Sequence, residues 1–396
     1  MALAERDFPD GFLFGAATSA HQVDGGNAGC DWWEWEQRGG SKDPSGDACD
    51  HYHRYPEDIA LLRDLGLKSY RFSVEWARIE PEEGRFDPAP LDHYRAMVDV
   101  CREVGVEPVV TLYHFTLPTW LSRRGGVLAP SSAQLFARYC REVARSLKGR
   151  VRWVLTINEP MILVLMGYLQ GVWAPGLRSP AAAVRAAHRL VAWHREAAAA
   201  IRQVDPGMQL GIAKHWIDFQ PLDVTNGLHR AGSALQHRLF NRWYLDQVKS
   251  LCDFIGINYY ARQYTTGLVH QVPLANAGDP HTDMGWSIAA EGLQAALEEA
   301  ATYGLPLMVT ENGIACEDDR ERIRYIDSHL ASVLAAMAHG ADVQGYQYWS
   351  LLDNFEWAEG YRPKFGLVAV DRTTQLRTVR ESARHLGEIA RSGRLV

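Results

Sequence analysis

Two short motifs, far apart in the chain, each contain a glutamate that follows a strand-like run. Residues 156–160 read Thr-Ile-Asn-Glu-Pro, and residues 310–313 read Thr-Glu-Asn-Gly. Each motif alone would also fit an exposed loop or an ordinary turn. Together, Glu159 and Glu311 are candidates for a pair that meets in one cavity, and two carboxylates are the chemical minimum for cleaving a glycosidic bond.

The elements that must position this pair alternate along the chain. Short apolar or β-branched runs alternate with amphipathic stretches, which is typical of repeated strand–helix units and a parallel sheet. Apolar residues recur every three or four positions in the helical stretches, including residues 56–65, 91–104, 180–204, 288–303 and 320–339. Eight strands are expected, at residues 12–18, 69–76, 107–114, 152–158, 209–216, 253–260, 305–311 and 343–350.

Two helix starts carry recognisable signals. Ser131 with Gln134 resembles a capping box, and Ser179 followed by Pro180 resembles an N-cap with proline at the first helical position. No linker rich in proline, serine or charge interrupts the alternation. The sequence therefore predicts an α/β protein with a single (β/α)8 TIM barrel, formed as one domain by residues 1–396.

Functional side chains of such barrels come from the carboxyl ends of the strands. Seven of the eight expected strands end in or near polar or aromatic residues, which predicts that they converge on a polar pocket. We interpret His215, one of these residues, as structural. The residues are Arg71, Glu75 and Trp76, then His114, Asn158, Glu159, His215, Asn258, Tyr259, Tyr260, Glu311 and Trp349.

The neighbours of the two carboxylates suggest separate roles. A separation of ~5–5.5 Å would indicate a retaining mechanism, in which one carboxylate attacks the sugar and the other protonates the leaving oxygen. Arg71 and Tyr260 can support an ionised Glu311. The charge on Glu311 is expected to raise the pKa of Glu159, which would then hold a proton and later act as a base.

From about residue 8 to 386 the sequence resembles glycoside hydrolase family 1, the β-glucosidase family. The resemblance implies that Glu159 is the acid/base, that Glu311 is the nucleophile, and that Asn158 binds the 2-hydroxyl of the sugar. The motifs that carry it are residues 12–18 (FLFGAAT), 70–73 (YRFS), 156–160 (TINEP), 256–260 (GINYY), 310–313 (TENG) and 349–357 (WSLLDNFEW).

The resemblance also implies a set of sugar-binding side chains. Glutamine and glutamate can grip adjacent hydroxyls, and an indole can stack on a sugar ring. For the aromatic residues and the histidine, core packing is the alternative. The candidates are Gln22, His114, Trp349, Glu356 and Trp357, with Trp120 and Phe365 as further members.

Several positions depart from the family pattern. Phe115 and Thr116 stand where the family has tryptophan and aspartate, and Asp24, Val127 and Lys364 also differ. Phenylalanine cannot donate a hydrogen bond, so a hydroxyl near the third ring position would lose a partner, at a cost of ~1–3 kcal/mol. One hypothesis is a site for an altered sugar or for several sugars; the other is harmless drift in an ordinary β-glucosidase.

The chain is also shorter than typical family members, which suggests trimmed loops after strands four to six and an open aglycone side. The predicted function is a retaining β-glycosidase, most simply a β-glucosidase, that hydrolyses O-linked β-D-glycosides from the non-reducing end. A transglycosylase and a non-catalytic sugar-binding module are the alternatives. Glu356 would repel a sugar 6-phosphate, and thioglucosidases of the family have glutamine in place of Glu159.

Composition and charge limit the kinds of molecule that the protein is expected to bind. With a net charge of −7 and no basic runs in 396 residues, neither nucleic acid nor an anionic membrane is expected to bind. The longest apolar stretch, residues 162–166, is too short to cross a bilayer, and a cytoplasmic location is expected. The six scattered cysteines are expected to be reduced, and no metal or organic cofactor is expected. The oligomeric state stays open.

Overall fold

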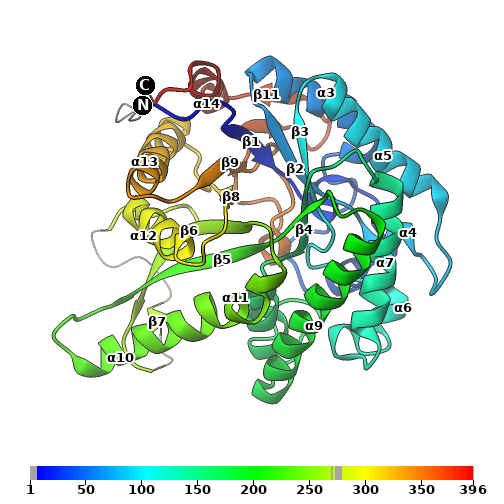
Figure 1. Cartoon of the computed structure of the whole chain (residues 1–396), viewed down its shortest axis with the longest axis horizontal. Coiled ribbons are helices and arrows are strands. Elements are labelled where there is room, and N and C mark those ends of the chain that lie inside the picture. Colours follow the sequence, from blue (N-terminus) through cyan, green and yellow to red (C-terminus); the bar gives the residue numbers. More distant parts are fainter. Residues whose placement is uncertain (1–6, 269–270, 273–278, 396) are drawn as a thin grey trace.

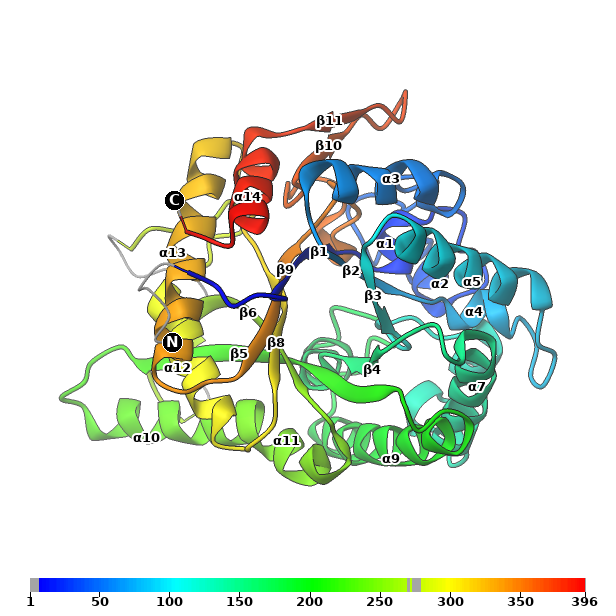
Figure 2. The same ribbon diagram turned by 45° about the horizontal axis from the view of Figure 1, so that its top comes forward.

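The computed structural model describes residues 7–268, 271–272 and 279–395, and its centre is a closed barrel of parallel strands (Figures 1 and 2). The barrel order follows the chain, and pairing of β5 with β6 completes the ring. All eight predicted strands are confirmed. They are β1 (Leu13–Ala17), β2 (Ser69–Ser73), β3 (Glu107–Thr111), β4 (Trp153–Asn158), β5 (Gln209–Pro221), β6 (Ile255–Thr265), β8 (Leu307–Asn312) and β9 (Val343–Trp349).

Side chains from different strands fill the interior of the barrel. Val109 of β3, Leu155 of β4, Ala213 of β5 and Met308 of β8 belong to one buried cluster. Since these strands lie on different sides of a closed ring, their side chains can meet only inside it. Because the strands are buried against this apolar interior as well as against the helices, their sequences are nearly continuous apolar runs.

Helices surround the strands (Figure 2). The helices are α1 (Ala20–Val23), α2 (Asp31–Glu36), α3 (His51–Leu65), α4 (Trp76–Ile79), α5 (Pro88–Glu103), α6 (Thr119–Ser122), α7 (Ser132–Leu147), α8 (Pro160–Leu163), α9 (Pro180–Val204), α10 (Gly227–Gln236), α11 (Trp243–Val248), α12 (Ala290–Ala301), α13 (Asp319–Ala338) and α14 (Glu381–Ser392). Among the described residues, no helix is long and apolar enough to cross a bilayer.

The two predicted helix caps have different outcomes. Ser179 caps α9 as expected, because its hydroxyl accepts from the backbone N–H of Ala182 at 3.2 Å. The capping box at Ser131 is wrong: this residue precedes α7, but its backbone is not extended (φ −92°, ψ 5°) and its side chain accepts no cap hydrogen bond. The helix α3 begins at His51, before the predicted start, and contains Pro56.

The strands β5 and β6 continue well past their predicted ends. Residues 217–221 and 261–265 pair with each other as a two-stranded ribbon, which Figure 1 shows projecting beside α10. An ion pair between Asp218 and Arg262 at 2.7 Å joins its two strands. The short strand β7 (Gln271–Val272) adds to β6 in the antiparallel direction. The ribbon contains several polar residues, so apolar runs in the sequence did not indicate it.

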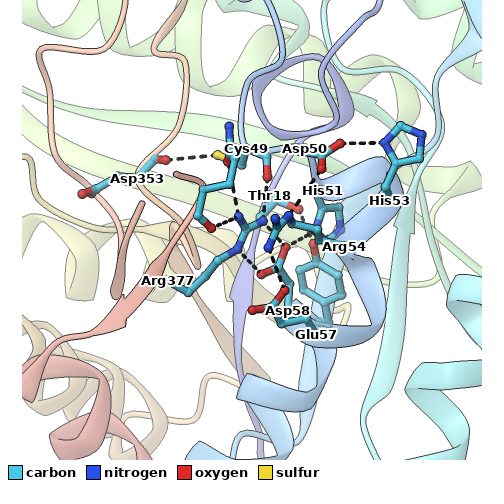
Figure 3. Close-up of polar contacts among 12 residues, drawn as sticks. Thr18, Cys49, Asp50, His51, His53, Arg54, Glu57, Asp58, Asp353 and Arg377 are labelled. Atoms are coloured by element: carbon cyan, nitrogen blue, oxygen red, sulfur yellow. Dashed lines mark hydrogen bonds and ion pairs between the residues drawn. The ribbon is translucent and has the colours of Figure 1, made fainter. Parts of the chain in front are cut away.

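A buried polar network fastens the C-terminal hairpin, β10 (Val368–Val370) and β11 (Arg377–Val379), to the barrel wall (Figure 3). Asp58 of α3 accepts from Arg377 Nε at 2.9 Å and lies 2.8 Å from His51 Nδ1. His51 Nε2 lies 3.0 Å from the Tyr70 hydroxyl, which lies 2.6 Å from that of Thr18. The network therefore joins the hairpin, α3, β2 and the end of β1.

Candidate active site

Arg71 is the centre of the polar pocket at the carboxyl ends of the strands. This β2 residue has no exposed surface, and its guanidinium reaches three other strands. It donates to Thr111 Oγ1 of β3 (3.1 Å), to Asn158 Oδ1 of β4 (2.6 Å), and to Glu311 Oε1 of β8 (2.5 Å). A further bond goes to the carbonyl oxygen of Thr310 (3.0 Å). One planar fork therefore sets the relative positions of four strand ends.

Glu311 has both carboxyl oxygens held. Oε1 accepts from Arg71, and Oε2 accepts from the Tyr260 hydroxyl of β6 at 2.6 Å. Burial raises the pKa of Glu311 to about 7, and the nearby carboxylate of Glu159 acts in the same direction. Arg71 and Tyr260 act in the opposite direction, so these two residues favour the ionised form, as the sequence suggested.

Glu159 immediately follows β4, where the backbone turns sharply. Its φ of 44° and ψ of 59° are left-handed, and its N–H donates to the carbonyl of Ala213 on β5 at 2.8 Å. The carboxyl Oε1 accepts from Asn258 Nδ2 of β6 at 2.8 Å and lies 2.8 Å from His215 Nδ1 of β5. The turn thus directs Glu159 into the same pocket as Glu311.

The structure contradicts the predicted rise in the pKa of Glu159. Burial favours the protonated form of Glu159, but the contacts with His215, Asn258 and Arg71 outweigh it and lower the pKa of this carboxyl. The raised pKa belongs to Glu311 instead. The sequence argument considered only the charge of one carboxylate on the other, and did not place His215 and Asn258 beside Glu159.

Three aromatic rings form a stacked wall beside Asn158. His114 lies parallel to Trp349 and Trp357, with ring centroids 5.9 and 6.1 Å away. The Nε2 atom of His114 lies 3.2 Å from Asn158 Nδ2, whereas its buried Nδ1 has no hydrogen-bond partner among the described residues. Trp349 Nε1 donates to Glu356 at 3.3 Å. His114, Asn158 and Glu356 thus line one surface with unsatisfied polar capacity.

Gln22 lies next to the loop that carries Glu356. It is fully buried, and its Nε2 donates to Asn354 Oδ1 (3.0 Å) and to the carbonyl of Phe355 (2.8 Å). Both amide hydrogens are therefore used within the protein. Any contact of Gln22 with a sugar would have to be made through its Oε1 atom, which already accepts from the Ser19 hydroxyl.

The last two candidates lie in different places. Phe365 packs edge-on against Tyr260, with centroids 6.2 Å apart, and so borders the Glu311 side of the pocket. Trp120 donates through Nε1 to the carbonyl of Glu80 and packs against Trp76 in the outer core. The structure does not bring Trp120 into contact with the other candidate residues.

Sequence reasoning placed His215 and Asn258 at the pocket but gave neither a functional role, and it interpreted His215 as structural. It did not consider Trp173, which packs against Phe115 and Trp357. His215 and Asn258 both lie near the ends of predicted strands, so their position was a usable signal. Trp173 lies in the loop after β4 and carried no such signal.

Three of the six non-glycine residues with left-handed backbone in the described part of the chain lie at this site. They are Phe115 (φ 72°), Glu159 (φ 44°) and Trp357 (φ 53°). This conformation costs an ordinary residue on the order of 1–3 kcal/mol, and such strain is typical of functional sites. The packing of the barrel therefore holds these side chains in directions that a relaxed backbone would not give.

A cavity of about 950 Å³ lies at the other end of the barrel. It is lined by residues that include Phe12, Lys68 and Arg394, but by no candidate site residue. Among the described residues, no group of three histidine, cysteine or acidic side chains is arranged to hold a metal ion. The chemistry of the strand ends, and not the size of a cavity, identifies the site.

Comparisons with known proteins agree with this geometry. Residues 4–254 and 246–394 match the model of glycosyl hydrolase family 1. Beta-glucosidase A of Thermotoga maritima is 34% identical over 428 residues, which cover 95% of this chain and 96% of that protein. A solved beta-glycosidase from Pyrococcus horikoshii superimposes with a TM-score of 0.94 at 40% identity, covering 98% of this chain and 96% of that one. The Thermotoga maritima beta-glucosidase in complex with glucoimidazole gives 0.92 at 32% identity, covering 99% and 100%.

Proposed function

Since this chain belongs to glycosyl hydrolase family 1 and is a retaining β-glycosidase, we propose that Glu311 is its nucleophile and Glu159 its acid/base. We propose further that its substrate is an O-linked β-D-glucoside of a small molecule. The observation that carries the assignment is the asymmetric support of the two buried carboxylates. Arg71 and Tyr260 hold both oxygens of Glu311, whereas only Oε1 of Glu159 is bound by described residues.

In the first step, an oxygen of ionised Glu311 attacks the anomeric carbon as the bond to the leaving oxygen breaks. Glu159 gives its proton to that oxygen, which departs as an alcohol. Formation of the ester removes the negative charge of Glu311. In the second step, Glu159 takes a proton from water, and the water oxygen replaces Glu311 at the anomeric carbon with the original configuration restored.

Recognition of the sugar would use the stacked wall and its polar rim. The free Nδ1 of His114, the second amide hydrogen of Asn158, and Glu356 are the proposed partners of sugar hydroxyls. Burial raises the pKa of Glu356 to about 8, so this carboxyl can donate as well as accept at neutral pH. The indole faces of Trp349 and Trp357, which are 4% and 6% exposed, are the proposed stacking surface for the apolar face of the ring.

Two variants test the assignment of the carboxylates with azide as an added nucleophile. In Glu311→Ala, azide can enter the vacated space and attack the substrate directly, so we expect an α-glucosyl azide. In Glu159→Ala, azide can attack the glycosyl-enzyme, so we expect a β-glucosyl azide. For a nitrophenyl β-glucoside without azide, each variant should lose on the order of 10²–10⁴-fold in kcat/KM.

The configuration of the two azide products, read by proton NMR, checks the roles. A dinitrophenyl glucoside serves as the control, because its leaving group hardly needs a proton and Glu159→Ala should cleave it with little loss in the first step. An α-azide from the Glu159 variant would overturn the assignment. Absence of nitrophenol release by the unmodified protein would overturn the proposed glucosidase activity and favour the non-catalytic sugar-binding alternative.

A second proposal concerns the sugar itself. Phe115 offers no hydrogen-bond donor, and Thr116 uses its hydroxyl to donate to the buried Glu75 at 2.8 Å. This supports a site that tolerates change at the third ring hydroxyl. A panel of aryl β-glucoside, galactoside, fucoside, xyloside and 3-deoxyglucoside should then show kcat/KM for the deoxy sugar within about tenfold of glucose. Strong selectivity for fully hydroxylated glucose would contradict it.

Transfer to an alcohol is the second outcome open to the same ester intermediate. The ratio of transfer product to free sugar, measured with added alcohol, separates a transglycosylase from a hydrolase. For location, we propose the cytoplasm, where thiols are kept reduced, because all six cysteines are free and buried.

A further inference from the structure

His215 lies against the proposed acid/base, and the reaction described above gives it no role. Its ring stacks on Tyr260, with centroids 5.8 Å apart and planes 17° from parallel. Phe240 meets the same ring edge-on, at 6.1 Å. These contacts hold the imidazole in one orientation, with Nδ1 2.8 Å from Oε1 of Glu159.

The two oxygens of Glu159 have different surroundings. Oε1 is contacted by His215 Nδ1 and accepts from Asn258 Nδ2, both at 2.8 Å. Asn258 is itself fixed, because its Oδ1 accepts from the Thr310 hydroxyl at 2.6 Å. No described residue hydrogen-bonds to Oε2. The site thus clamps one oxygen and leaves the other for the substrate.

We propose that His215 is a positioning residue that donates from Nδ1 to Oε1 of Glu159, so that Oε2 alone carries the reacting proton. The inference rests on the proposed acid/base role of Glu159. In the first step, the proton on Oε2 moves to the leaving oxygen while Glu311 bonds to the anomeric carbon. In the second step, Oε2 takes a proton from water while the ester bond breaks. His215 keeps its Nδ1 proton throughout.

Several charged or titratable groups face Glu159 besides His215. Arg71 from β2 also favours its ionised form, which agrees with the lowered pKa of this carboxyl, whereas Glu311 from β8 opposes it. Tyr260 from β6 donates to Glu311 and does not bind Glu159. Lys214, on β5, contacts the carbonyl of His215, and burial lowers its pKa to about 7. Among the described residues, only His215 and Asn258 lie within hydrogen-bonding distance of the carboxyl.

The pH dependence of kcat/KM for a nitrophenyl β-glucoside tests the role of His215. One limb of this profile reports the protonation of Glu159 and the other that of Glu311. His215→Phe keeps a ring to stack on Tyr260 but removes the donor, so the pKa of Glu159 should rise. We expect the Glu159 limb to move about one unit to higher pH, a tenfold change in the protonated fraction. His215→Asn keeps an N–H donor and should recover part of the shift.

A matched control is His237→Asn. His237 also pairs with a glutamate, since its Nε2 lies 2.9 Å from Glu299, but it does not touch either catalytic carboxylate. This variant should leave the Glu159 limb unchanged. A structural role alone would lower activity without moving the limb, so the pH profile separates positioning from packing.

A second measurement does not need turnover. The carboxyl carbon of Glu159, assigned through Glu159→Gln, can be titrated by ¹³C NMR in the unmodified protein and in His215→Phe. The same upward shift is expected. If both the Glu159 limb and the NMR titration of His215→Phe match those of the unmodified protein, the inference is overturned. An inactive unmodified protein would instead contradict the proposed function, and the NMR titration would still decide the role of His215.

Discussion

Arg71 is a buried side chain that fixes the relative positions of several strand ends. Its charge partner is Glu311, and its remaining donors bind groups of β3, β4 and β8. An unpaired buried charge is expensive, so the guanidinium is stable here because every donor group finds an oxygen. The price of burying it is offset by the fixed geometry of the carboxylate that it holds.

Lysine in this position cannot reproduce that geometry, because an ammonium group has no planar fork. We expect Arg71→Lys to lower kcat/KM by ~10²–10³-fold. Burial has already raised the pKa of Glu311 to about 7, and weaker pairing should raise it further. Since the proposed nucleophile must be ionised to react, the limb of the kcat/KM profile that reports Glu311 should move to higher pH.

The control for this prediction is Arg202→Lys, which weakens an ion pair with Asp253 on the outer side of the barrel. Its profile should match that of the unmodified protein. A Glu311 limb that stays in place in Arg71→Lys would show that Arg71 does not support the charge of Glu311.

At the level of single residues, sequence predicted types well and contacts less well. Glu159, Glu311, Arg71 and Tyr260 were proposed for one pocket because a barrel brings strand ends together. The contact of His215 with Glu159 could not be predicted, because it depends on the left-handed turn after β4, which no residue type in the motif indicates. The lowered pKa of Glu159 was missed for the same reason.

The ends of the strands are where elements of this barrel depart from regular geometry. After β8, Gly313 passes so close to β9 that a Cβ on it would lie 1.8 Å from the carbonyl oxygen of Trp349. This close approach explains why glycine follows the Glu-Asn pair. Because of this contact, the position of β8, which carries the proposed nucleophile, depends on the position of Trp349, a proposed sugar-stacking residue.

We expect Gly313→Ala to push β8 and β9 apart at their carboxyl ends. The free energy of unfolding should fall by ~1–3 kcal/mol, the usual cost of overpacking, and KM should rise because Trp349 moves. Urea unfolding and steady-state kinetics measure the two effects. Gly29→Ala is the control: its nearest atom would be at 3.6 Å, an ordinary contact, so little change is expected. Equal behaviour of the two variants would contradict the argument.

Element prediction succeeded where burial dictates the pattern. The strands of the barrel and α9 were found because both faces of a strand, or one face of a helix, must be apolar. The ribbon at residues 217–221 and 261–265 was missed because it leaves the core, and its pairing depends on a partner strand and on the Asp218–Arg262 ion pair. The start of α3 was missed because Pro56 was taken as a boundary.

At the scale of the whole molecule, the network around Asp58 connects the two ends of the fold (Figure 3). Asp58 is fully buried, and Arg377 has only 3% of its side chain exposed. Burial would raise the pKa of Asp58, but the contacts with His51 and Arg377 lower it. The ion pair therefore stabilises the attachment of the C-terminal hairpin only while Asp58 is ionised.

We expect Asp58→Asn to lower the free energy of unfolding by ~3–5 kcal/mol at pH 7, because Arg377 would remain buried without its partner. A group with a lowered folded pKa stabilises above its unfolded value, near 4, and this contribution is lost as the pH falls through the folded value. The difference between variant and unmodified protein should therefore shrink in acid. Urea unfolding at several pH values measures it.

Asp64→Asn provides the matched control, because Asp64 is on the same helix but pairs with Arg63 in solvent. Its effect should stay within ~0.5 kcal/mol at every pH. A loss for Asp58→Asn that does not shrink in acid would show that its cause is packing and not charge.

The two ends of the described chain meet beneath the barrel. Phe8 N–H donates to the carbonyl of Gly393 at 2.7 Å, just ahead of the amino end of β1, whereas the carboxylates lie where the strands finish. A tether fixed at either end would consequently hold the enzyme on a solid support with its entrance facing the liquid. The same adjacency makes a circularly permuted version feasible, with its old ends joined by a short peptide.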